Sequence, residues 1–132
     1  MKKLFLLCSM LGSFSLLAQK NSPADLAEQQ LKAYNQRNID AFLEPYSDSV
    51  KVYEFPDKLM YKGKETMRKS YAEMFKGFPE LNCTLKSRVV VGNTVIDEEK
   101  VFIKKGMPLI HAVAIYKVAL GKIQEVYFIS EK

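Results

Sequence analysis

Two side chains in the sequence are candidate proton-transfer groups. Glu54 ends an apolar, β-rich stretch and precedes Phe55 and Pro56. A carboxylate against apolar neighbours can hold and release a proton near neutral pH. His111 is the only histidine, the residue type whose charge changes in that range. Each also has a purely structural interpretation, as an exposed strand-end acid and as a rim or surface histidine. We predict Glu54 and His111 as the candidate catalytic residues.

The densest acidic run is Asp97, Glu98 and Glu99, inside a predicted strand. Alternation along a strand places Asp97 and Glu99 on one face and Glu98 on the other. Two carboxylates on one face could perform acid–base chemistry or hold a cation, whereas most charge runs form a solvated face. We expect a solvated face here, and we include Asp97 among the predicted pocket-lining residues.

Several other chemistries have little support in the sequence. Cys83 and His111 could form a nucleophilic pair, but no local signature accompanies them, and a lone cysteine is more often a small buried hydrophobe. One histidine and one such cysteine make a poor metal site. The chain has neither a glycine-rich phosphate loop nor a G-x-S-x-G elbow. We therefore predict no cofactor and no metal.

The first 18 residues have the pattern of a secretory signal peptide. Lys2 and Lys3 precede an apolar run, and the chain turns polar after Ala18. The apolar run is shorter than the roughly 20 residues that a membrane-spanning helix needs. We predict a signal peptide at residues 1–18, a single domain at residues 19–132, and a secreted or periplasmic protein that does not contact the membrane after cleavage.

Cleavage would change the charge and the cysteine content of the chain. Loss of Lys2 and Lys3 lowers the formal net charge from +5 to +3, and the remaining positive charge forms no dense block. A nucleic-acid partner is therefore not expected. Loss of Cys8 leaves Cys83 alone, so no internal disulfide is expected in spite of the oxidising destination.

Periodicity and turn residues predict an α+β domain. Ser22 and Asp25 suit a capping box around Pro23, and Gly92-Asn93 suits a two-residue hairpin turn. Helices are predicted at residues 22–37, 39–43 and 63–77, and strands at 50–55, 84–91, 94–104, 109–119 and 122–130. Short connections between consecutive strands predict an antiparallel sheet. If this sheet curves strongly around the helices, it leaves a conical, mainly apolar pocket.

Tyrosines are the expected polar groups of that pocket. Tyr34 and Tyr71 lie on apolar helix stripes yet have a polar tip. Alternation places Tyr116 on the face opposite His111 and Lys117, and the lysine suggests that its own face is wet. We predict Tyr34, Tyr71 and Tyr116 as pocket-lining residues, and a flat apolar molecule as the ligand.

Five segments together resemble the SnoaL-like branch of the nuclear transport factor 2-like superfamily. They are residues 33–42 (AYNQRNIDAF), 46–52 (YSDSVKV), 61–65 (YKGKE), 95–99 (VIDEE) and 114–123 (AIYKVALGKI). The resemblance covers nearly all of residues 19–132. It implies a curved sheet around helices with a conical pocket, often in a homodimer. It implies no single activity, because the family includes isomerases, cyclases, dehydratases and binding modules.

The resemblance also allows a test for isomerase-like chemistry. Aligned on residues 47–49, it places Glu54 at the position of the isomerase base, whereas alignment on Pro56 places Phe55 there. It places Gln30 and Ala114 at the positions of the two proton donors. Gln30 can donate a hydrogen bond but Ala114 cannot, so the expected oxyanion stabilisation is incomplete. We include Gln30 among the pocket-lining residues.

Three functional hypotheses follow. The first is an exported pocket domain that binds a small apolar molecule. The second is a cofactor-independent isomerase, cyclase or dehydratase with Glu54 or His111 as general base. The third is a homodimeric interaction module that pairs through its sheet face and retains a vestigial pocket.

Overall fold

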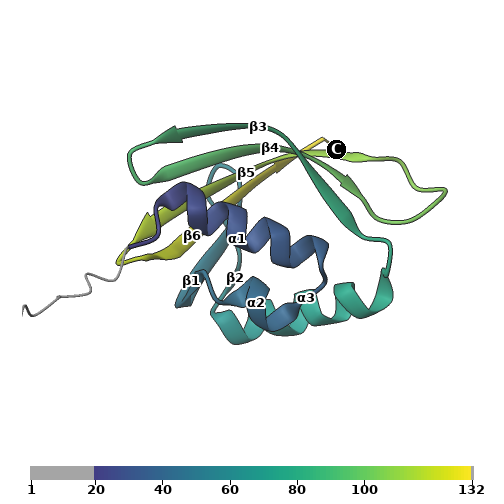
Figure 1. Ribbon diagram of the computed structural model, residues 1–132, viewed down its shortest axis with the longest axis horizontal. Coiled ribbons are helices and arrows are strands. Elements are labelled where there is room, and N and C mark those ends of the chain that lie inside the picture. The colour runs from purple at the N-terminus through teal and green to yellow at the C-terminus, as the bar shows by residue number, and fades with distance from the viewer. Residues whose placement is uncertain (1–19, 132) are drawn as a thin grey trace, which may run out of the picture.

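Within residues 20–131, three helices cover one face of a six-stranded sheet (Figure 1). The computed structural model describes residues 20–131, so the predicted signal peptide lies outside the described residues. Within this range no helix is both long and apolar enough to span a membrane. The sheet has the strand order β2-β1-β6-β5-β4-β3 and does not close into a barrel, which confirms the predicted α+β class.

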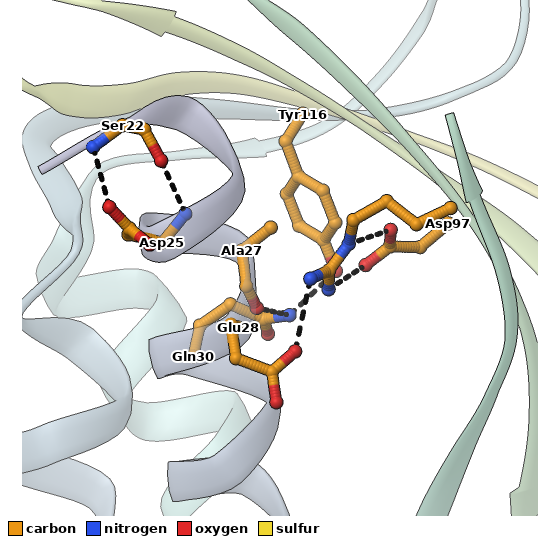
Figure 2. Close-up of polar contacts among 8 residues, drawn as sticks. Ser22, Asp25, Ala27, Glu28, Gln30, Asp97 and Tyr116 are labelled. Atoms are coloured by element: carbon orange, nitrogen blue, oxygen red, sulfur yellow. Dashed lines mark hydrogen bonds and ion pairs between the residues drawn. The ribbon is translucent and has the colours of Figure 1, made fainter. Parts of the chain in front are cut away.

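Helix α1 (Pro23–Asn35) begins at the predicted capping box. Ser22 accepts a hydrogen bond from the Asp25 backbone N–H at 3.1 Å, and the Asp25 carboxylate accepts one from the Ser22 N–H at 2.9 Å (Figure 2). These bonds satisfy backbone donors that the first helical turn leaves free. The buried stripe of α1 then faces the sheet and includes Ala27 and Gln30.

Two further helices close the lower part of the fold in Figure 1. Helix α2 (Ile39–Leu43) is capped by Asn38, which accepts a hydrogen bond from the Ala41 N–H. Helix α3 (Lys64–Gly77) follows Gly63, whose φ of +97° favours glycine. The Gly63 N–H donates to the Val50 carbonyl at 2.7 Å and fixes the start of α3 against β1.

The last four strands form the predicted antiparallel meander. They are β3 (Asn82–Val91), β4 (Thr94–Phe102), β5 (Ile110–Ala119) and β6 (Lys122–Ser130). The register pairs Val91 with Thr94 and Ala119 with Lys122, which confirms both tight turns. These turns lie between neighbouring strands, where local sequence decides the pairing.

The first part of the sheet differs from the prediction. Strand β1 (Tyr46–Glu54) starts earlier than expected, and β2 (Lys58–Lys62) was not predicted because it is a largely exposed edge strand without a clear apolar alternation. One pairing departs from the predicted antiparallel sheet, because β1 pairs with β6 in parallel. No turn joins these two strands, so no local signal specifies their direction.

The core lies between the helices and the face of the sheet that they cover. Phe42 and Val52 are almost fully buried in it. Phe42 packs against Tyr71 at a ring-centroid distance of 4.5 Å and against Tyr46 at 5.3 Å. This aromatic cluster joins α2, α3 and β1, and it forms one wall of the cavity described next.

Candidate functional site

A cavity of about 160 Å³ lies between the helices and the covered face of the sheet. Six aromatic side chains are among the described residues that line it, namely Tyr34, Phe42, Tyr46, Tyr71, Tyr116 and Phe128. Its polar lining residues with other side chains are Gln30, Cys83 and Glu99. Glu99 is the one carboxylic acid among the described residues that line it.

Strand β4 brings two acids to the buried face of the sheet. Asp97 is fully buried and Glu99 is 6% exposed, whereas Glu98 points to the other face and is partly exposed. The predicted alternation is therefore confirmed, but the expected solvated face for Asp97 and Glu99 is wrong. Helix α1 packs against β3 and β4 on this face, and the acidic run itself could not reveal this contact.

Asp97 is neutralised by a cross-strand arginine. Arg88 on β3 donates from Nε to Asp97 Oδ1 at 2.7 Å and from Nη2 to Asp97 Oδ2 at 2.9 Å. Its remaining Nη1 donates to Glu28 Oε2 on α1 at 3.0 Å. Such bidentate pairing satisfies a buried carboxylate. Figure 2 shows these contacts as dashed lines that end on Asp97 and on Glu28.

Glu99 has no comparable cation of its own. Burial raises its pKa to about 7, and the negative charge of Asp97 adds to the effect. The Cys83 thiol, the Arg88 charge and the Tyr116 hydroxyl act in the opposite direction on this pKa. At neutral pH the Glu99 carboxyl is thus close to half protonated, which is the condition of an efficient general acid or base.

A hydrogen-bonded chain of side chains fixes the inner end of the cavity. Gln30 Nε2 donates to the Tyr116 hydroxyl at 2.9 Å and to the Ala27 carbonyl at 3.0 Å. The Tyr46 hydroxyl donates to Gln30 Oε1 at 3.2 Å. Gln30 therefore links α1 to β1 and β5 and holds two phenol groups in fixed positions beside Glu99.

The phenols and the thiol of the cavity stay protonated at neutral pH. Burial raises the pKa of Tyr46, Tyr71 and Tyr116 well above the ordinary value. Burial also raises the pKa of Cys83, and the nearby Glu99 raises the pKa of this thiol further. The Tyr46 proton is already donated to Gln30, and Cys83 is a poor nucleophile because the thiolate is the reactive form.

A family model for the SnoaL-like domain matches residues 27–126. The chain belongs to the SnoaL-like family. No curated protein matches the chain. The match confirms the resemblance read from the five sequence segments.

Solved structures agree with this assignment of fold. An uncharacterized cystatin-fold protein from Novosphingobium aromaticivorans is 26% identical, with 83% of this chain and 98% of that chain covered and a TM-score of 0.74. An NTF2-like protein of unknown function from Cytophaga hutchinsonii is 16% identical, with coverages of 87% and 95% and a TM-score of 0.72. A SnoaL-like protein of unknown function from Burkholderia thailandensis is 15% identical, with coverages of 83% and 94% and a TM-score of 0.70.

The structure brings most of the predicted pocket residues of this SnoaL-like domain together. Gln30, Tyr34, Tyr71 and Tyr116 all line the cavity. Asp97 does not line it, because its carboxylate is held by Arg88. Glu99, two residues further along β4, lines the cavity, where we had expected Asp97.

The two predicted catalytic residues lie elsewhere. The Glu54 side chain is 43% exposed, pairs with Lys58 at 3.1 Å and is not among the cavity-lining residues. His111 lies on the opposite face of β5, where Nδ1 is 2.9 Å from Glu131 Oε1. Neither side chain shares the cavity with Glu99. Among residues 20–131, no three His, Cys, Asp or Glu side chains gather as metal ligands.

Sequence reasoning missed Glu99 as the acid of the site. The available signal was the face that it shares with Asp97 and, across the paired strands, with Cys83. A lone cysteine is usually buried, so its neighbours on the same face are candidates for burial too. The Ala114 position, where relatives with isomerase activity would have an acidic donor, is fully buried and apolar here.

Proposed function

We propose that this SnoaL-like domain binds a small, mainly apolar molecule with one polar group. The observation that supports the proposal is a largely aromatic cavity in which Glu99 is the single carboxylic acid among the described residues that line it. Its volume of about 160 Å³ is close to that of an engineered apolar cavity of about 150 Å³ that takes benzene. Sites for drug-sized ligands are roughly 300–1,000 Å³. The ligand is therefore about the size of one ring.

A second candidate function is acid–base catalysis in the same cavity. The pKa of Glu99, about 7, favours this function. The general base would then be Glu99 instead of Glu54 or His111. The Tyr116 hydroxyl accepts from Gln30 and retains its own proton, so it would supply a hydrogen bond to a developing negative charge. Under this hypothesis a bound carbonyl compound would lose a proton from carbon to Glu99, and solvent exchange of that proton is the measurable sign.

The binding proposal is tested with toluene and benzyl alcohol as probes, by isothermal titration calorimetry and by chemical-shift changes. We expect both to bind, and we expect Ala112→Phe, which fills the cavity, to abolish binding. Val113→Phe is the matched control, because the neighbouring side chain points to the other face of β5. Equal binding by both variants, or no binding of either probe to the unaltered protein, would contradict the proposal.

We further propose that the protein is exported, on the strength of the signal-peptide pattern in residues 1–18. The full chain, expressed in a bacterial host, should be recovered outside the cytoplasm with a new N-terminus near residue 19. N-terminal sequencing of the recovered protein measures this. Recovery of the uncleaved chain from the cytoplasm would count against export.

Homodimer formation through the outer face of the sheet is also proposed. Apolar side chains remain exposed on this face, including Val89 at 54% and Ile129 at 41%. Exposed apolar patches of this kind are common at protein interfaces. Sedimentation analysis of the protein and of Ile129→Lys should give a dimer and a monomer, respectively; a monomer in both cases would exclude the dimer.

A further inference from the structure

We infer that the cavity takes a small primary amine in its ammonium form, with the nitrogen against Glu99 and the apolar body against the aromatic rings. This inference deepens the proposed binding function and rests on it. It specifies the polar group of the ligand, which the size and apolarity of the cavity leave open.

The first argument for an amine ligand is the balance of charge around the cavity. Arg88 is the cation that acts on Glu99, but its guanidinium is already bonded to Asp97 and Glu28. Among the described residues that line the cavity, none is a lysine, arginine or histidine. Three acids therefore share one cation. A cationic ligand supplies the missing charge, whereas an anionic ligand would add an uncompensated charge in a desolvated place.

The second argument for an amine ligand is the aromatic wall of the cavity. Rings of Tyr34, Phe42, Tyr71 and Phe128 surround the space next to Glu99. The faces of aromatic rings attract cations, and the attraction is stronger when water is excluded. Phenol oxygens can also accept hydrogen bonds from an ammonium group. A buried carboxylate within an aromatic wall thus matches both the charge and the donors of a primary amine.

The third argument for an amine ligand is the protonation of Glu99. Its pKa of about 7 means that its ionisation at neutral pH costs little free energy, and a bound cation favours the ionised form. Amine binding should therefore release protons below about pH 7. The charged and titratable groups that act on the pKa of Glu99 are Asp97, Arg88, Cys83 and Tyr116. Glu99 in turn helps to raise the pKa of Tyr34, Tyr46 and Tyr71, which face it from the other elements.

The test compares three probes of similar shape, namely benzylamine, benzyl alcohol and toluene, by calorimetry at about pH 7.5. We expect benzylamine to bind at least about tenfold more tightly than benzyl alcohol. Glu99→Gln should abolish this preference and still bind benzyl alcohol. Glu98→Gln, one residue away on the other face of β4, is the matched control and should keep the preference.

The outcomes separate this inference from the proposed function. If benzyl alcohol and toluene bind but benzylamine binds no better, or if Glu99→Gln keeps the preference, the amine inference is overturned and the binding function stands. If no probe binds, both are overturned. Should Glu99→Gln fail to fold, the unaltered protein decides: the preference must grow between about pH 5.5 and about pH 8, and a constant preference overturns the inference.

Discussion

Gln30 donates a hydrogen bond from Nε2 to the hydroxyl of Tyr116 at 2.9 Å, across 86 residues of sequence. The same amide accepts a hydrogen bond from Tyr46 through Oε1. One side chain of α1 therefore sets the position of two phenols on different strands. All three side chains are buried, so both phenols depend on Gln30 for these hydrogen bonds.

Gln30→Leu should destabilise the protein by about 1–3 kcal/mol, because it leaves the buried Tyr46 and Tyr116 hydroxyls without their shared partner. Urea unfolding followed by circular dichroism measures the change. Gln36→Leu, at the exposed end of α1, is the control and should change the free energy of unfolding by less than about 0.5 kcal/mol. Equal effects of the two substitutions would refute the structural role of Gln30.

Arg88→Met should cost about 3–5 kcal/mol of stability, because it leaves the fully buried Asp97 carboxylate unpaired. Arg68→Met is the control, since Arg68 pairs with the exposed Asp40 and such pairs contribute about 0–1 kcal/mol. The double substitution Arg88→Met, Asp97→Leu should recover much of the loss, as it removes both charges. A double variant less stable than Arg88→Met alone would contradict this account.

Glu99 should make the protein less stable as the pH rises. Its pKa is raised from 4.5 to about 7 in the folded chain, so between these values the folded state holds a proton that the unfolded state has released. The free energy of unfolding therefore falls from about pH 4.5 to about pH 7, by about 3–4 kcal/mol, since one pKa unit corresponds to about 1.4 kcal/mol.

Glu99→Gln isolates that contribution. This variant should lack the fall and should be more stable than the unaltered protein above about pH 7. Denaturant unfolding at a series of pH values measures the difference, and Glu98→Gln should retain the fall. Parallel pH profiles for Glu99→Gln and the unaltered protein would show that Glu99 does not titrate as described.

Glu54→Gln should leave the affinity for benzyl alcohol unchanged within about twofold, because Glu54 lies outside the cavity and shares no partner with it. His111→Gln should behave in the same way, since His111 lies on the outer face of β5. Calorimetric titration of both variants provides the check. A loss of affinity for either variant would return that residue to the candidate site.

Local sequence was sufficient for several parts of this protein. The capping box at Ser22 and Asp25, the turns after Val91 and Ala119, and the opposite faces of His111 and Tyr116 all follow from neighbouring residues. Such features depend on backbone periodicity and on a few hydrogen bonds within one turn. The order of elements and the five family segments then indicated the fold.

Only the tertiary structure decided which acid belongs to the cavity. Strand alternation separates Glu99 from Glu98 but cannot say which face is covered, and it predicts nothing about the parallel pairing of β1 with β6. Burial of Glu99 requires α1 to pack across β4, and the neutralisation of Asp97 requires Arg88 on the neighbouring strand. These contacts join segments that are distant in sequence, so no pattern of neighbouring residues predicts them. The fold class and the faces of the strands, in contrast, follow from the periodicity of neighbouring residues.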